Sequence, residues 1–136
     1  MGKVVFSKII VGYDGSSHSD KALDLAIEIA KRFNSKIALI HVVPYTYVGR
    51  ASEEDIRKGE EVLKKGVEKL KEAGIEYESR LVEGDPAEKM AEIASSEGYD
   101  AIIVGSRGLG GFKELLLGSV SHKLTHHAKC TVIITR

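Results

Sequence analysis

The apolar positions of the chain form short runs separated by longer stretches of helical periodicity. Runs rich in β-branched residues occupy 9–11, 37–43, 75–82, 99–104 and 131–135. The run at 37–43 is almost continuously apolar, which is typical of a strand buried on both faces in a parallel sheet. The run at 75–82 alternates between apolar and polar residues, so we predict an edge strand there.

Amphipathic stretches separate these runs. From Ser17 the apolar residues recur on one helical face, and Asp20 follows Ser17 at the spacing of a capping box, so we predict that a helix begins at Ser17. A second helix is predicted over 53–73, with Gly74 as its C-cap. Within it, Gly59 and Gly66 would each cost about 1 kcal/mol of helix stability.

Two further helices complete the pattern. Pro86 suits the first turn of a helix that follows the edge strand, and 112–127 is predicted to be partly helical. The order β-α-β-α-β-α-β-α-β with short connections predicts an α/β fold, a doubly wound five-stranded parallel sheet with helices on both faces. No stretch resembles a linker, so residues 1–136 are predicted to form one domain.

Composition narrows the classes of partner. Apolar residues make up 43% and charged residues 29% of the chain, as in ordinary globular proteins. Twenty basic residues balance twenty acidic ones, which gives no electrostatic reason to expect nucleic acid or a membrane as partner. The lone Cys130 suits a reducing compartment, and the chain starts without a signal-peptide pattern, so we expect a cytoplasmic protein.

The most informative segment for function runs from Gly105 to Ser119. Five glycines lie between positions 105 and 118, directly after a buried strand. That place is the carboxyl edge of an α/β sheet, where ligands bind, and glycine lets backbone N–H groups approach phosphate oxygens. Arg107 and Lys113 add positive charge, and Ser119 could cap a helix whose N-terminus favours anions.

These residues alone leave two interpretations open. Glycine after a strand often serves turn geometry only. The P-loop pattern is absent from the chain, and the dinucleotide fingerprint fails because Lys113 stands where its third glycine would be. A phosphate site and a shaped loop therefore remain alternatives at this level.

The spacing Gly105-x2-Gly108-x9-Gly118-Ser119 resembles the ATP-binding signature of the universal stress proteins. The resemblance extends over essentially the whole chain, including the first strand that ends at Asp14 and the pair His41-Val42 at the end of the second. It implies the sheet order 3-2-1-4-5 of adenine-nucleotide-binding and flavodoxin-like folds. Strands one and four are then neighbours, and a crevice opens between their carboxyl ends.

The resemblance also implies roles for individual residues. Asp14 matches the residue that contacts the nucleoside through ribose hydroxyls, and Val42 matches the position whose backbone pairs with the adenine edge. The remaining matched positions lie at the ribose and in the phosphate cradle: Val104, Gly105, Gly108, Gly118, Ser119 and Val120. Gly12 departs from the proline of some members, which predicts a looser wall of the base pocket. A role for Arg107 at the phosphates is our own inference.

The implied ligand is ATP, or AMP or ADP, with Mg²⁺ carried on the phosphates. We weigh three functions: a nucleotide-binding stress-response or signalling module, a slow Mg²⁺-dependent ATPase or phosphotransferase that uses the same site, and a structural dimer. The resemblance implies a homodimer through strand 131–135, whose apolar edge invites pairing. The sequence leaves the protein partner and the physiological nucleotide open.

Other candidate chemistry is less favoured. His122, His126 and Cys130 recur at intervals of four residues, but Cys130 is expected beyond the helix end and no carboxylate completes a metal site. His41 in an apolar strand is interpreted as a hydrogen-bonded core residue rather than a catalytic base. No serine has the Gly-x-Ser-x-Gly context of a nucleophile, so no catalytic residue is assigned.

Overall fold

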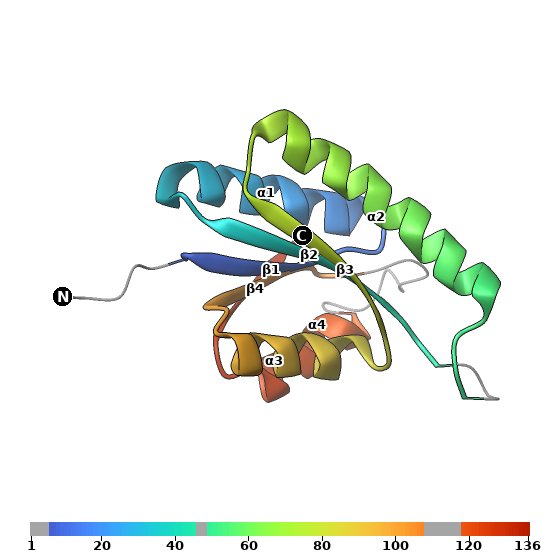
Figure 1. The fold of residues 1–136 in the computed structure, drawn as a ribbon. Coiled ribbons are helices and arrows are strands. Elements are labelled where there is room, and N and C mark those ends of the chain that lie inside the picture. The colour runs from blue at the N-terminus through green and yellow to red at the C-terminus, as the bar shows by residue number, and fades with distance from the viewer. Residues whose placement is uncertain (1–5, 46–48, 108–117) are drawn as a thin grey trace.

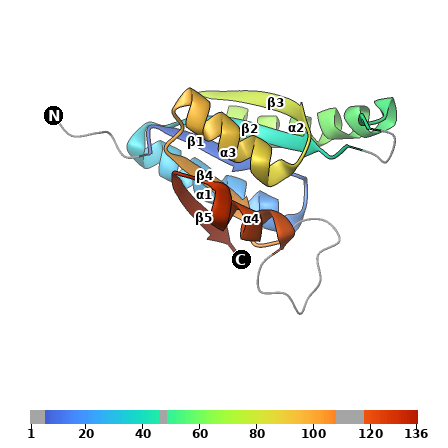
Figure 2. The ribbon, with the colours of Figure 1, turned by 90° about the horizontal axis from the view of Figure 1, so that it is seen from below.

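A computed structural model of the chain describes residues 6–45, 49–107 and 118–136. Five parallel strands form one sheet in the order β3-β2-β1-β4-β5. Their bounds are Lys8–Gly12 for β1, Lys36–Val43 for β2, Tyr77–Glu83 for β3, Ala101–Gly105 for β4 and Thr131–Thr135 for β5. Figure 2 shows β3 and β5 at opposite edges of the sheet. The predicted fold class, strand order and edge position of the third strand are confirmed.

Helices cover both faces of the sheet. They are α1 (Ser17–Phe33), α2 (Glu53–Ala73), α3 (Pro86–Glu97) and α4 (Ser119–His127). Helices α1 and α2 lie on one face, and α3 and α4 lie on the other (Figure 1). Strand residues alternate between two buried clusters: Ile9 and Val11 pack under α1, whereas Ile10 packs with Met90 and Leu124 of the other face. Two apolar layers therefore enclose the sheet.

Two predicted helix caps are corrected by the structure. Helix α1 begins at Ser17, but its N-cap is Ser16, whose hydroxyl accepts from the Ser19 N–H at 3.1 Å. Helix α4 is capped by Gly118 without a side-chain hydrogen bond, so Ser119 is its first residue and not its cap. In both cases the cap is the residue with an extended backbone, which lies one position before the residue that we chose.

The glycines of α2 have a structural reason that helix propensity does not reveal. A Cβ at Gly66 would lie 2.5 Å from Leu39 Cδ2, and one at Gly59 would lie 2.8 Å from His41 Cδ2. The two positions are seven residues apart and therefore share one helical face. Their missing side chains let α2 lie close against β2. Of the described helices, none is both long and apolar enough to cross a membrane.

Candidate functional site

The site lies beside β1, where the strand order reverses: the chain continues to β2 and β3 on one side of β1 and later to β4 and β5 on the other. Strand β1 pairs with β2 on one side and with β4 on the other, and this central position is a topological switch point. A pocket of about 780 Å³ opens at the carboxyl ends of these strands. This volume is within the range of small-molecule sites, roughly 300–1,000 Å³.

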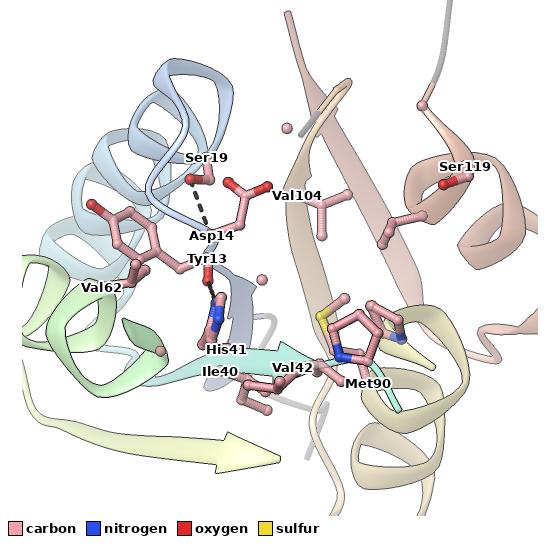
Figure 3. Close-up of a pocket in the computed structure, with 18 of the residues that line it drawn as sticks. Tyr13, Asp14, Ser19, Ile40, His41, Val42, Val62, Met90, Val104 and Ser119 are labelled. Carbon is pink, nitrogen blue, oxygen red and sulfur yellow. Dashed lines mark hydrogen bonds between the residues drawn. The ribbon is translucent and has the colours of Figure 1, made fainter. Parts of the chain in front are cut away.

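The pocket brings the predicted residues together from distant parts of the chain. Gly108 lies outside the described residues, and every other predicted site residue lines the pocket: Gly12, Asp14, Val42, Val104, Gly105, Arg107, Gly118, Ser119 and Val120. Figure 3 shows Asp14 and Ser119 on opposite sides, with Val104 between them. Their roles in binding remain predictions, but the predicted meeting of the two segments is present in the structure.

The end of β2 presents backbone groups to the pocket. The last pair between β1 and β2 is Gly12 with Ile40, and the Tyr13 N–H donates to the Ile40 carbonyl at 2.9 Å. Strand β2 continues to Val43 beside β3. Since the backbone groups of a strand alternate in direction, those of Val42 point to the same side as those of Ile40, where β1 has already ended. The N–H and C=O of Val42 thus face the pocket.

The turn after β1 holds Asp14 at the pocket. The Asp14 carboxylate accepts from the Ser16 N–H at 2.9 Å, and the Asp14 N–H donates to the Ser19 hydroxyl at 3.3 Å. On the other side, the Tyr13 carbonyl accepts a hydrogen bond from His41 Nδ1 at 2.8 Å. Figure 3 shows these side chains converging on the turn. The turn is therefore fixed by contacts from both α1 and β2.

Tyr13 anchors the same turn in the core. Its hydroxyl donates to Asp20 at 2.6 Å, and Lys69 of α2 lies 3.4 Å from the same carboxylate oxygen. Burial and the hydrogen bond to Asp20 raise the pKa of Tyr13 well above its ordinary value, so the phenol stays protonated and keeps donating. The aromatic ring thereby links β1 to α1 and α2.

The glycine at the end of β4 serves packing as well as the pocket. A Cβ at Gly105 would lie 2.6 Å from His18 Cβ and 2.7 Å from the His18 carbonyl carbon. The first turn of α1 therefore approaches the backbone of β4 directly. The predicted benefit for phosphates is not the only reason for glycine here, because the missing Cβ faces α1.

Ser106 fixes the remaining side of the pocket. Its N–H donates to the Thr135 carbonyl at 2.6 Å, and its own carbonyl accepts from the Gly118 N–H at 2.5 Å and from the Ser121 hydroxyl at 3.1 Å. Its hydroxyl lies 3.4 Å from His18 Nδ1. One buried residue thus joins the end of β5, the start of α4 and the first turn of α1.

The wall at Gly12 is filled and not loose. A Cβ at this position would lie 2.8 Å from Met90 Sδ and 2.9 Å from Val104 Cγ1. Side chains from α3 and β4 thus lie where the Cβ of a larger residue, proline included, would be. The prediction of a looser wall is wrong, because it considered position 12 without its neighbours across the sheet.

Sequence reasoning missed several residues of the pocket. Tyr13, Ser19, Val62, Met90 and Ser106 line it but belong to no motif. Their places follow from the fold: Tyr13 precedes Asp14 in the turn, and Val62 lies on the face of α2 that meets the sheet. Tyr13 beside Asp14 was the one available signal, since residues at strand ends line such crevices.

The candidate metal row of His122, His126 and Cys130 does not line this pocket. His122 and His126 lie on the exposed side of α4 with ring centroids 5.0 Å apart, and Cys130 lies after the helix. Within the described ranges, no group of three or more His, Cys, Asp or Glu side chains is placed to hold a metal ion. Burial raises the pKa of the half-buried Cys130 thiol, which makes it a poor nucleophile.

Comparison with known proteins places this geometry in a family. The profile of the universal stress protein family matches residues 6–136. The chain is 34% identical to universal stress protein YxiE of Bacillus subtilis, over 97% of this chain and 100% of that protein.

Two solved structures share the fold over nearly their full lengths. A universal stress protein in complex with cAMP is 28% identical with a TM-score of 0.79, over 97% of this chain and 98% of that one. A family protein from Arabidopsis thaliana with AMP bound is 28% identical with a TM-score of 0.71, over 95% and 90% of the two chains. The sequence signature, the sheet order and these matches agree, and the chain belongs to the universal stress protein family.

Proposed function

We propose that this chain binds an adenine nucleotide, ATP or its relatives ADP and AMP, in the pocket at the carboxyl edge of the sheet. It would act as a nucleotide-dependent stress-response or signalling module whose bound state is read by a protein partner. The observation that carries the proposal is the offset between β1 and β2: β2 extends to Val43, past its last pair with β1 at Ile40. The backbone groups of Val42 therefore face the pocket and not a neighbouring strand. An N–H and a C=O on one residue match the acceptor and donor on the edge of adenine.

The rest of the pocket supports the same ligand. Asp14 lines the same pocket as Val42, and its carboxylate can accept from ribose hydroxyls. Across the pocket, the N-terminus of α4 and Arg107 suit phosphate oxygens. The known complexes with AMP and cAMP have ligands of this class in relatives of the same fold. Mg²⁺ would enter on the phosphates of ATP, and no metal-binding side chain is proposed for it.

Binding is tested on the purified protein after removal of any co-purified nucleotide. Because the chain has no tryptophan and five tyrosines, a retained nucleotide would raise the 260/280 nm absorbance ratio clearly. Calorimetric titration with ATP, ADP and AMP, each with and without Mg²⁺, then ranks the ligands. Absence of binding by all three at millimolar concentration would reject the proposal.

Two variants locate the site. Asp14→Ala removes the ribose acceptor, and Gly118→Val puts a branched side chain at the start of α4. Gly118 has φ −76° and ψ 172°, an extended conformation open to valine, so the fold should survive. Asp24→Ala on the exposed side of α1 is the control. We expect weaker ATP binding in the first two variants only.

A phosphate-release assay on the same protein tests whether ATP is hydrolysed. Phosphate release is followed for hours with Mg²⁺ in wild type and in Asp14→Ala. Turnover well above one per minute that disappears in the variant would favour a slow ATPase or phosphotransferase over a binding module. Release at the rate of buffer alone would favour the module.

We also propose that the chain forms a homodimer through β5. This strand is one edge of the sheet, and Val132, Ile133 and Ile134 are only half-buried in the chain alone. Pairing with a second β5 across a twofold axis would cover these side chains and satisfy the outer backbone groups.

A further inference from the structure

One peptide unit at the pocket is held by side chains on both of its polar atoms. The carbonyl of Tyr13 accepts from His41 Nδ1 at 2.8 Å, and the N–H of the next residue, Asp14, donates to the Ser19 hydroxyl at 3.3 Å. These two groups belong to the same peptide plane. His41 comes from β2 and Ser19 from α1, so the plane is held between a strand and a helix (Figure 3).

This double contact occurs where the sheet no longer holds the chain. The Tyr13 N–H makes the last backbone bond of β1 to β2, to the Ile40 carbonyl. Beyond it the backbone leaves the ladder, and a turn that carries a binding residue would ordinarily be mobile. Instead, Ser19 is 4% and Tyr13 is 3% exposed, and a third hydrogen bond of this turn runs from the Ser16 N–H to Asp14 Oδ1. The direction of the Asp14 carboxylate is therefore set before any ligand arrives.

We propose that His41 and Ser19 are positioning residues that aim the Asp14 carboxylate at the ribose hydroxyls by clamping the Tyr13–Asp14 peptide. This inference rests on the proposed function and adds to it the residues that give the site its preference for a ribose. Neither residue needs to touch the nucleotide for this role. Their removal should reduce discrimination between ribose and deoxyribose more than affinity for the base and phosphates.

The clamp fixes the protonation of one imidazole nitrogen. A carbonyl oxygen can only accept, so His41 Nδ1 must carry the hydrogen that it donates to Tyr13. The neutral ring then has its lone pair on Nε2, the reverse of the tautomer that free imidazole side chains prefer. The ring itself is held by α2, because a Cβ at Gly59 would lie 2.8 Å from Cδ2 and 3.3 Å from Nε2. The tautomer is thus a direct signature of the clamp.

Substitutions at position 41 separate the clamp from simple packing. The amide nitrogen of asparagine lies near the place of histidine Nδ1, so His41→Asn can still donate to the Tyr13 carbonyl. Leucine fills a similar space without a donor, so His41→Leu breaks one side of the clamp. Ser19→Ala breaks the other side. Ser16→Ala is the control, because it removes the α1 cap while the Ser16 N–H remains on Asp14.

The experiment measures dissociation constants for ATP and 2′-deoxyATP with each protein, and the ratio of the two is the readout. Because a hydrogen bond to a charged group is worth about a tenfold change in binding or more, wild type should prefer ATP by about tenfold and Asp14→Ala should lose this preference. We expect ratios near one in His41→Leu and Ser19→Ala, and a ratio near the wild-type value in His41→Asn and Ser16→Ala. Imidazole nitrogen shifts of the wild-type protein should show a proton on Nδ1.

The outcomes distinguish this inference from the proposed function. If wild type binds neither nucleotide, both fail. If wild type binds ATP but shows no preference over 2′-deoxyATP, or if His41→Leu and Ser19→Ala keep the wild-type ratio, the clamp is overturned while nucleotide binding stands. An Nε2–H tautomer in the wild-type protein would overturn it as well. Loss of the ratio in Ser16→Ala would reduce the effect to helix stability and reject the positioning role.

Discussion

Replacing Gly105 with alanine should destabilise the fold, although this glycine belongs to the phosphate signature. The added Cβ would lie 2.6 Å from His18 Cβ, which is 0.8 Å short of the 3.4 Å at which ordinary contacts begin. It would also lie 2.7 Å and 2.8 Å from the carbonyl carbon and oxygen of His18. Because these last two are backbone atoms in the first turn of α1, no side-chain rotation can relieve the contact. The helix start must move away from β4.

The cost can be estimated from overpacking in other cores. Inserting a methyl group into a packed region costs about 1–3 kcal/mol. For a chain of this length, 1 kcal/mol lowers the melting temperature by about 4 °C, so we expect a decrease of about 4–12 °C. Displacement of α1 would also disturb the contact between His18 and Ser106 and weaken nucleotide binding secondarily.

The assay compares Gly105→Ala with Ser119→Ala in nucleotide-free protein by scanning calorimetry. Nucleotide must be removed first, since a bound ligand stabilises the fold by an amount that rises with the logarithm of its concentration over its Kd. Ser119 is exposed and makes no side-chain cap, so its replacement should change stability by less than about 0.5 kcal/mol. A melting temperature unchanged within about 1 °C in Gly105→Ala, together with lost ATP binding, would refute the packing argument and leave only a phosphate role.

Three other predictions concern the remaining surfaces. The Ser106 N–H donates to the Thr135 carbonyl, so the backbone groups of Val132, three residues earlier, point away from β4 toward the open edge of the sheet. Val132→Pro should therefore give a folded monomer by light scattering, whereas a folded dimer would exclude this edge as the dimer interface. Hydrogen bonds from Tyr99 and then Arg80 lower the pKa of Glu78 below its unfolded value of about 4.3, so the stability that Glu78 contributes is complete above that pH and is lost as the pH falls through the folded pKa. Glu78→Gln should therefore lose less stability than wild type below pH ~4, and parallel acid denaturation curves of the two proteins would argue against this. Burial raises the pKa of Cys130, so iodoacetamide at pH ~8 should alkylate it more slowly than an unfolded-chain thiol, and equal rates would contradict the burial.

The sequence was sufficient for the architecture because each element has a strong local pattern. The continuous apolar run of β2 and the one-sided periodicity of α1 predicted their types, and Gly74 marked the end of α2 correctly. Helix starts have weaker local signals. Ser16, Ser17 and Ser19 offer several hydroxyls within one turn, and only the extended backbone of Ser16 identifies the cap.

The residues of the candidate site were predictable in two ways. The Gly105–Ser119 segment stands out by its glycine spacing after a buried strand, whereas Asp14 and Val42 follow only from the resemblance to the universal stress proteins. His41 was assigned to the core, and its contact with Tyr13 is visible only once β2 extends beyond β1. Gly59 and Gly66 looked unfavourable for helix propensity, because propensity takes no account of the strand that packs beneath the helix. Contacts of this kind depend on the tertiary fold and leave no local signal.

The offset between β1 and β2 has a consequence for how such a pocket tolerates mutation. If the base is bound by the N–H and C=O of residue 42, recognition depends on the backbone there. The side chain of residue 42 packs in the apolar layer that contains Met90 and Leu124. Exchange of valine for isoleucine or threonine should then leave base preference unchanged. An insertion or deletion that altered how far β2 extends past β1 would abolish it. Base recognition would then tolerate point substitutions at position 42 but not changes in strand length. The preference for the base would depend on how far β2 extends past the end of β1.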